Sequence, residues 1–450
     1  MSSQPRQSQG HLKRILGLGF GLAVIFGGTV GVGILRLPGE IAGKLGSAGP
    51  IFLVWVVGGI YSLLGAISLA ELGAALPQAG GFYVYSKRAF GPATGFAMGW
   101  ADWLNNCAGL AYVAVTASEY LLALLPETLG HIAYIQTGIS LGLLLAFCTV
   151  QWFGLRLSSG IQKLASSVTA ITFLALAVAC LLHPKHAAAA AFGRHTAATH
   201  GAGMFAMLVV VFATLPAIVV AYDGWYEAIY FTEEDTNAAK NLPRAMIGGV
   251  VLVTGLYLLM NLAFLHVLTI PQLANSKLAA ADAARMVFPA WSGTFVTVLS
   301  LLTLLSFLNA VLLGAPRILF AVGRDGLFRG AANVGPGGTP RTALVVTAAM
   351  VAIFVLSGKF DEIIGVAAIL MACMYCVNYV AVFVLRYREP ALARPFRAWG
   401  YPITTGLVLL GSLVFLAGDV RQDWVSAARA AVLLVLAMPV YWWKMRRERL

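Results

Sequence analysis

The chain has 450 residues, of which 60% are hydrophobic and only 11% are charged, and its formal net charge is +12. Soluble domains carry roughly 25% charged residues, so this composition excludes a soluble protein and indicates one embedded in a membrane. The apolar sequence carries no basic stripe with interleaved aromatic residues, so nucleic acid is not an expected partner.

A polar N-terminal tail, 1–14, precedes the first long apolar segment, 15–42. A cleaved signal peptide has a shorter apolar stretch and a small-residue cleavage site, so this segment is interpreted as a retained first span. Its middle reads Gly-Gly-Thr-Val-Gly-Val-Gly-Ile over 27–34, and Gly31 and Gly33 permit a break in the helix. Free N–H groups at such a break, beside a helix N-terminus, would attract a carboxylate. The alternative is that the small glycines only allow close helix packing.

A membrane-spanning helix needs about 20 apolar residues, and the hydropathy of the chain predicts twelve of them. They cover 15–42, 49–74, 95–125, 131–153, 161–182, 203–232, 246–268, 288–323, 341–357, 361–386, 402–418 and 425–443. The fold class is therefore all-α and integral to the membrane.

The loop charges predict the orientation of these helices. With the N-terminus in the cytoplasm, that side holds 21 of the 30 Lys and Arg residues and the opposite side holds 8, with Arg36 beside the first helix. Both termini are thus expected in the cytoplasm, as an N-terminal tail at 1–14 and a basic tail at 444–450. This distribution also explains the positive net charge.

A second break is predicted in the sixth segment, where 219–225 reads Val-Val-Ala-Tyr-Asp-Gly-Trp. Asp223 is an ionisable residue in an apolar run, which usually marks a transport pathway, and Gly224 weakens helix continuity. Carbonyl groups freed here would accept hydrogen bonds from an ammonium group. Together the two breaks suit a zwitterion with adjacent carboxylate and amine groups, which is an α-amino acid. Alternatively, or in addition, Asp223 caps the second half of the helix.

The spacing of the segments predicts an inverted repeat. Five spans (15–182) precede an alanine-rich loop at 186–201, and five more (203–386) follow it. An odd number of spans inverts the second unit relative to the first, and each unit begins with a broken segment, the arrangement that marks a transporter binding site. The last two spans, within 402–443, lie outside the repeat.

All five cysteines lie in apolar segments. Cys373 and Cys376 have the CxxC spacing, but their helical, apolar flanks favour packing over a metal or redox site. No metal site is therefore expected from the cysteines and histidines, and no accessory subunit linked by a disulfide is expected.

Several sequence runs, in order, resemble the amino acid–polyamine–organocation (APC) transporters, most closely their L-amino-acid-transporter-like branch. The runs are Gly31-Val32-Gly33-Ile34-Leu35, 70–77 with 80–85, Ala221-Tyr222-Asp223-Gly224-Trp225, Glu233-Glu234, 241–244, Asn309, Arg317, 324–326, Thr339-Pro340 and 394–397. The resemblance implies a LeuT-like fold, in which a five-plus-five inverted repeat with broken helices 1 and 6 is followed by two extra C-terminal helices.

The resemblance also implies roles for particular residues. The N–H groups of Val32 and Gly33 would hold the substrate carboxylate, and carbonyl groups of both breaks would hold the amine. The complete expected substrate-binding set is Thr29, Val32, Gly33, Ile34, Asn106, Val220, Ala221, Tyr222, Asp223 and Gly224. For Asn106, which matches a third-helix polar position, the alternative is a hydrogen bond between helices.

Three positions depart from the family pattern. Val32 replaces a frequent serine, Val220 replaces the aromatic residue that covers the substrate in many relatives, and Thr169 replaces a lysine whose ammonium can substitute for a sodium ion. Thr303 and Ser306 match hydroxyl positions near a coupling ion, although such side chains more often bond their own helix. Thr169, Thr303, Ser306 and Asp223 are therefore the candidates for coupling to H⁺ or Na⁺, and no other cofactor is expected.

These observations predict a secondary active transporter that moves neutral L-amino acids by alternating access. Few acidic residues lie at cavity depth, which argues against the alternative of a polyamine or modified-amine carrier. A substrate sensor on the same fold is a further alternative, whereas an enzyme is not expected because no catalytic motif accompanies the acids. The short loops suggest a bacterial inner membrane, where lipids surround the protein; the sequence indicates no oligomeric state.

Overall fold

The computed structural model describes residues 12–126, 134–184 and 214–447. The alanine-rich loop at 186–201, the start of the predicted sixth span and most of the N-terminal tail lie outside these residues. All named elements are helices: α1 (Leu18–Thr29), α2 (Val32–Leu45), α3 (Ala48–Ala75), α4 (Phe82–Phe90), α5 (Pro92–Leu122), α7 (Ile135–Trp152), α8 (Leu155–Leu182), η1 (Glu227–Phe231), α10 (Ala238–Val267), α11 (Ile270–Ala274), α12 (Ala279–Val287), α13 (Ser292–Arg324), η2 (Arg329–Ala332), α14 (Arg341–Ser357), α15 (Phe360–Arg388), α16 (Ile403–Gln422) and α17 (Trp424–Arg447).

Within the described residues, seven helices are long and apolar enough to cross a membrane, and α1 with α2 would form an eighth span with a bend. Each of the twelve predicted ranges contains a helix. The count of twelve spans stays a prediction, because several of these helices are shorter or less apolar than the seven that meet the requirements for crossing a membrane. The inverted repeat also stays a prediction. Hydropathy did not indicate the short helices α4, α11 and α12, which have too few residues to span a bilayer.

The first predicted break is an interruption between α1 and α2. α1 ends at Thr29, Gly31 is extended (φ −134°, ψ −155°), and α2 begins at Val32. The two helices meet at an angle of 48°. The N-cap position of α2 has no side-chain cap, so N–H groups in the first turn of α2 have no capping side chain.

The sixth segment is also interrupted. A helix covers 214–222 of the described residues, a turn follows at 223–226, and the chain continues as the 3₁₀-helix η1. Gly224 has φ +103°, a left-handed conformation that favours glycine. The helix therefore ends at the Asp223-Gly224 sequence, because Gly224 can adopt the backbone conformation that changes the direction of the chain.

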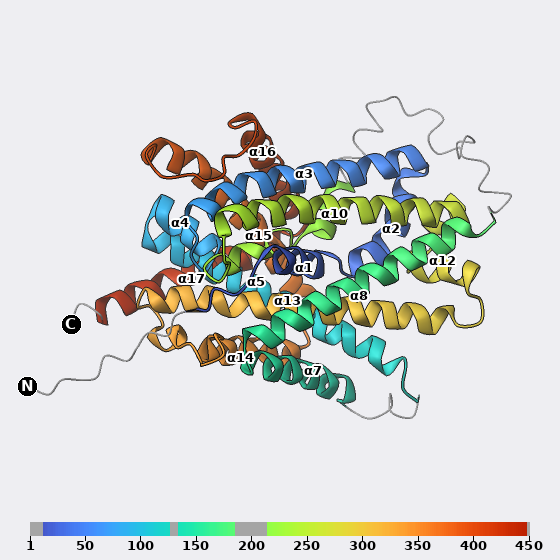
Figure 1. The fold of residues 1–450 in the computed structure, drawn as a ribbon, viewed down its shortest axis with the longest axis horizontal. Coiled ribbons are helices and arrows are strands. Elements are labelled where there is room, and N and C mark those ends of the chain that lie inside the picture. Colours follow the sequence, from blue (N-terminus) through green and yellow to red (C-terminus); the bar gives the residue numbers. More distant parts are fainter. Residues whose placement is uncertain (1–11, 127–133, 185–213, 448–450) are drawn as a thin grey trace, which may run out of the picture.

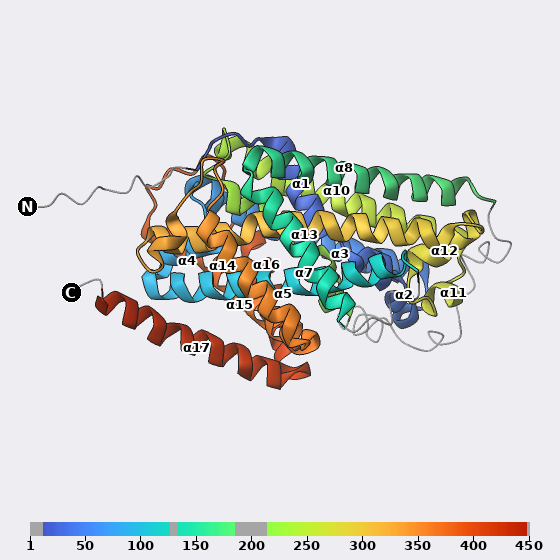
Figure 2. The same ribbon diagram turned by 90° about the horizontal axis from the view of Figure 1, so that it is seen from below.

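Both interrupted segments lie in the middle of the helix bundle. α1 contacts α8, α10, α13 and η1, and α10 also packs along α3. Figure 1 shows α1 between α10 and α8, while Figure 2 shows α17 at the outer edge of the molecule. The bundle thus surrounds the two breaks with other helices.

At one end of the bundle, backbone and ionic contacts join the two interrupted segments. The N–H groups of Ile15 and Leu16 each donate to the carbonyl of Glu234 at 3.0 Å, and the N–H of Thr236 donates to the carbonyl of Leu16 at 2.9 Å. The Glu234 carboxylate forms an ion pair with Arg317 of α13, and both side chains are buried, 0% and 1% exposed. Arg317 also lies over the Phe231 ring.

Candidate functional site at the two helix breaks

The two breaks are in direct contact. A Cβ atom added to Gly33 would lie 3.4 Å from the Cα of Ala221, and one added to Gly224 would clash with the backbone carbonyl of Gly28. The glycines at these positions therefore allow two main chains to approach each other. The structure brings the two stretches that the sequence singled out to one place in the bundle.

A single hydroxyl links the two breaks. Tyr257 of α10 donates from its hydroxyl to the carbonyl of Ala221 at 2.9 Å, and the carbonyl of Thr29 lies 3.1 Å from the same oxygen. Both carbonyls belong to the set expected to hold a substrate amine. They therefore point to a common position, where a donor from the protein already contacts them.

The predicted substrate-binding residues have different environments. Ile34 and Tyr222 are fully buried in an apolar cluster, and the Tyr222 hydroxyl donates to the Trp55 carbonyl. The hydroxyl oxygen of Thr29 is buried without a hydrogen-bond partner. Val220 is 52% exposed. Backbone groups of these residues, more than their side chains, make the common surface of the site.

Tyrosines engage the Asp223 carboxylate. Tyr375 of α15 donates to its Oδ1, and the Tyr226 hydroxyl lies 3.5 Å from its Oδ2. The Trp225 ring stacks on that of Tyr375, with ring centroids 5.7 Å apart. No side-chain cap is present at the start of η1. The Asp223 carboxylate thus lies against the aromatic side chains of Trp225, Tyr226 and Tyr375, and the structure shows no capping bond from it to η1.

Asn106 lies in the same region but bonds within its own helix. Its amide donates to the backbone carbonyl of Asp102 at 2.8 Å and to the Asp102 carboxylate at 3.0 Å. The bond that crosses between elements is instead made by Tyr230 of η1, whose hydroxyl donates to Asp102 at 2.7 Å. Asn106 therefore orients Asp102, and the expected hydrogen bond between helices is supplied by Tyr230.

The candidates for ion coupling separate into two groups. Thr303 donates to the Leu299 carbonyl of its own helix at 2.7 Å, and the Thr169 hydroxyl is buried without a partner. Ser306, in contrast, belongs to a buried polar cluster with Gln162 and Ser166 of α8. The two hydroxyls thus have different hydrogen-bond partners: Thr303 bonds its own helix, whereas Ser306 bonds residues of α8.

Gln162 is the centre of this polar cluster. Asn309 donates a hydrogen bond of 2.8 Å to the side-chain oxygen of Gln162. The side-chain nitrogen of Gln162 therefore faces the backbone carbonyl of Ala23 and the hydroxyls of Ser166 and Ser306, at 3.0–3.3 Å. An uncharged donor thus contacts the oxygen atoms between α1, α8 and α13. Within the described residues, no group of three or more His, Cys, Asp or Glu side chains could hold a metal ion.

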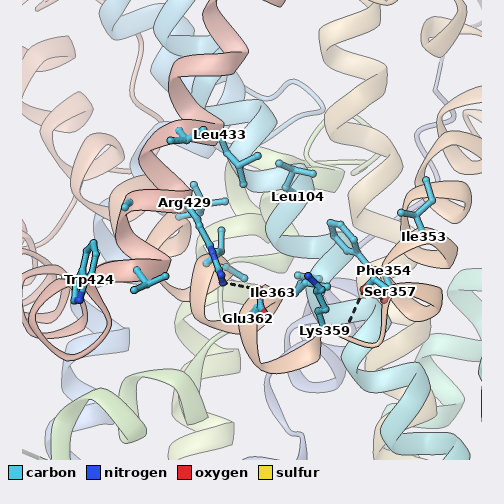
Figure 3. Close-up of a pocket in the computed structure, with 17 residues that line it drawn as sticks. Leu104, Ile353, Phe354, Ser357, Lys359, Glu362, Ile363, Trp424, Arg429 and Leu433 are labelled. Atoms are coloured by element: carbon cyan, nitrogen blue, oxygen red, sulfur yellow. Dashed lines mark hydrogen bonds and ion pairs between the residues drawn. The ribbon is translucent and has the colours of Figure 1, made fainter.

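Three cavities stand out among the described residues, and no break residue lines any of them. The largest is an open groove of about 640 Å³ between α5, α14, α15 and α17, lined almost completely by apolar atoms. Figure 3 shows Arg429 of α17 paired with Glu362 of α15 at one end of it. The space between the breaks is instead occupied by main-chain contact and by Tyr257.

Sequence reasoning missed several residues that complete this site, namely Gln162, Glu227, Tyr230, Tyr257 and Tyr375. A glutamine and a glutamate within otherwise apolar segments were visible signals, because polar residues at that depth are costly. The tyrosines gave no such signal, since tyrosine is common in apolar helices and only the fold shows what its hydroxyl contacts.

Comparison with known proteins gives a consistent result. A model of the amino acid permease family matches residues 21–439. The chain is 27% identical over 443 residues to the serine/threonine exchanger SteT of Bacillus subtilis, covering 97% of this chain and 98% of that protein. It is 25% identical to the b(0,+)-type amino acid transporter 1 of Mus musculus (96% and 88% covered) and 28% identical to the mouse Asc-type amino acid transporter 1 (86% and 73% covered).

These matches confirm the resemblance to the APC transporters and indicate a transporter and not an enzyme. The apolar helices agree with a protein that crosses the membrane several times. With its family match extending over nearly all of its length, the chain belongs to the amino acid permease family.

Proposed function

We propose that this protein is a secondary transporter that moves small neutral L-amino acids across a bacterial inner membrane by alternating access. In this proposal it has twelve spans, a five-plus-five inverted repeat and both termini in the cytoplasm. The relatives include a serine/threonine exchanger, which supports small neutral side chains as the first substrates to test.

The observation that carries the proposal is the meeting of the two breaks. The carbonyls of Thr29 and Ala221 converge on one hydroxyl donor, so they have the geometry to accept hydrogen bonds from an ammonium group as well. The first turn of α2, from Val32, has N–H groups without a capping side chain, which suit a carboxylate. An α-amino acid would satisfy both sets of backbone groups at once.

The side chains near the breaks support a small substrate. Valine stands at position 220, where many relatives carry an aromatic residue, and glycine at 31 and 33 leaves the backbone accessible. A smaller covering residue gives less apolar contact to a large side chain. We therefore expect serine, threonine and alanine to be preferred over aromatic amino acids.

The polar cluster around Gln162 supports transport without sodium. An amide donor already contacts the Ala23 carbonyl and the Ser306 hydroxyl, which are oxygen ligands of the kind that Na⁺ would use. A bound Na⁺ would have to displace that amide from its buried position. The driving force in this proposal is exchange of amino acids or a proton gradient.

Uptake of a panel of labelled amino acids into liposomes that contain the purified protein tests the proposal. Exchange of external labelled L-serine for internal unlabelled L-serine is expected, with no change when choline replaces Na⁺. If no amino acid in the panel is exchanged or stabilises the protein against heat, the proposed function is wrong.

A second candidate is a carrier of polyamines or modified amines. Two buried acids, Asp102 and Glu227, and the half-buried Asp223 lie near the breaks, which gives more acidic groups at this depth than hydropathy alone indicated. An amine carrier would be inhibited strongly by putrescine and weakly by L-serine in the same exchange assay, which is the reverse of the expectation above.

A further inference from the structure

Glu227 is a buried acid for which the binding of an amino acid leaves no role. It is the first residue of η1, directly after the second break, and its side chain is 2% exposed. Its Oε2 atom is buried and has no hydrogen-bond partner. Buried polar atoms are nearly always hydrogen-bonded, so an unpartnered carboxylate oxygen in a membrane-embedded bundle needs a specific explanation.

The surroundings of Glu227 make room for its carboxyl group. A Cβ on Gly28 of α1 would lie 2.7 Å from the Glu227 Cγ, and a Cβ on Gly314 of α13 would lie 3.0 Å from its Oε2. Any larger residue at these two positions would collide with the side chain. The carboxyl group therefore packs tightly between α1 and α13, two helices that would move in a transport cycle.

A second buried acid, Asp102 on α5, lies near Glu227. Tyr230 packs against Glu227 and bonds Asp102, so this one side chain contacts both acids. The Tyr230 hydroxyl donates to Asp102 Oδ1, while its ring packs beside Glu227 at Gly314. Asp102 is 0% exposed and its Oδ2 is also buried without a partner.

The other titratable groups around this pair carry no compensating positive charge. The titratable groups on its own segment are Asp223, Tyr226 and Tyr230, and none of them carries a positive charge. α1 has no titratable residue, and the α10 residues that line a small cavity together with η1 are Asn241, Leu242 and Ala245, none of which is charged. The neighbouring base on α13 is Arg317, which is paired with Glu234.

Two carboxylates buried together in a low-dielectric region without a basic partner cannot both stay ionised at low cost. We propose that Glu227, with Asp102 beside it, is a proton-binding site of the transport cycle. The step is the formation of one O–H bond on the Glu227 carboxylate with a proton from the aqueous phase on one side, and its loss to the other side. This inference rests on the proposed function, because a proton can be coupled only to a substrate that moves.

The experiment compares exchange with proton-driven accumulation in liposomes that hold a pH-sensitive dye. With labelled L-serine as the probe, or the panel amino acid that exchanges fastest, the wild-type protein should accumulate label when the outside is acidic and should acidify the interior. Glu227→Gln has a neutral side chain of the same shape. It should retain exchange at a reduced rate and lose both the accumulation and the dye signal.

Glu119→Gln is the matched control, because Glu119 lies exposed on α5 and bonds only the side chain of Gln136 among the described residues. If Glu227→Gln still accumulates label under the pH gradient, or if the wild-type protein exchanges amino acids without moving protons, the inference is wrong. If the wild-type protein does not exchange at all, the proposed function is wrong, and the inference with it.

Asp102→Asn provides a second test in case Glu227→Gln does not fold. Removing the neighbouring negative charge should weaken proton binding about tenfold, which moves the pH of half-maximal uptake about one unit towards acid. A pH profile identical to that of the wild-type protein would overturn the inference. Loss of the pH profile together with a preference for cationic amino acids would instead assign the pair to a substrate side chain, which also overturns it.

Discussion

The hydroxyl of Tyr257 on α10 donates a hydrogen bond of 2.9 Å to the backbone carbonyl of Ala221 in the second helix break. Because the Thr29 carbonyl of the first break lies 3.1 Å from the same hydroxyl, one side chain sets the relative position of the two breaks. A carbonyl oxygen has two lone pairs, so both can accept a further donor from a substrate. Tyr257 is therefore a positioning residue for the proposed amine site.

Tyr257→Phe should lower the rate of amino acid exchange about fivefold to tenfold. The change removes one hydrogen bond from the two buried carbonyls, a loss of about 1–1.4 kcal/mol, which corresponds to a fivefold to tenfold effect. Tyr61→Phe is the control, because the Tyr61 hydroxyl contacts Ser412 of α16 and neither break. Equal exchange rates in the wild-type protein and in Tyr257→Phe, measured in liposomes, would contradict this role.

Asp223→Asn should reduce transport at least about tenfold while the protein is still made and folded. The carboxylate is the acceptor for Tyr375 and lies next to the Tyr226 hydroxyl, and hydrogen bonds to charged groups are the stronger ones. Asp282→Asn, at the surface pair with Arg285, should leave transport unchanged. Wild-type uptake in Asp223→Asn at every pH would remove Asp223 from the mechanism.

Gly224→Ala should impair folding as well as transport. Alanine at φ +103° is strained, and its Cβ would collide with the Gly28 carbonyl, so the two breaks would have to separate. Gly255→Ala in α10 is the matched control, since nothing lies within 4 Å of its added Cβ and alanine favours a helix. The melting temperature in detergent should fall for Gly224→Ala and stay equal or rise for Gly255→Ala.

Replacing Gln162 tests the coupling region. Gln162→Ala removes the amide that contacts Ala23, Ser166 and Ser306, and leaves buried oxygens of α1, α8 and α13 without that donor. We expect severalfold slower exchange in this variant and no effect of Na⁺ on the wild-type protein. Gln136→Ala, at the half-buried start of α7 and away from this cluster, should behave like the wild-type protein. Exchange that stops when choline replaces Na⁺ would refute sodium-independent transport.

The buried ion pair between Arg317 and Glu234 should be important for stability. Arg317→Met leaves the Glu234 carboxylate buried without its partner, which costs about 3–5 kcal/mol. The double variant Arg317→Met, Glu234→Leu should recover much of that loss, because a buried pair and an apolar pair of similar size are often equally stable. Melting temperatures in detergent measure both effects. A single variant as stable as the wild-type protein would contradict the prediction.

The sequence was sufficient for the features that depend on main-chain chemistry. Glycine at 31 and 224, and an aspartate in an apolar run, indicated where the helices are interrupted, because lipid cannot satisfy an open main chain. Gly33, also expected at the first break, lies instead in the first turn of α2. The structure places those interruptions at 30–31 and 223–226. The positions of the breaks could thus be predicted from residues that are local in the sequence.

The side chains that complete the site could not be predicted in this way. Tyr257 is 36 residues from Ala221 in the sequence. Glu227 and Asp102 are also far apart in the sequence, and they come together only because η1 packs against α1 and α13 and Tyr230 bonds Asp102. The same limit applies to Gln162, whose partners are on three helices. Contacts between distant segments depend on the fold, which periodicity alone does not define.

The isolated β-bridge between Leu16 and Asp235 has a consequence for how the molecule can move. Main-chain bonds join the stretch before α1 to the stretch after η1, and these bonds do not depend on the side chains of the residues involved. The stretch before α1 and the stretch after η1 are therefore linked, and we expect them to move together in any conformational change. A cross-link that immobilises either stretch should immobilise the other as well.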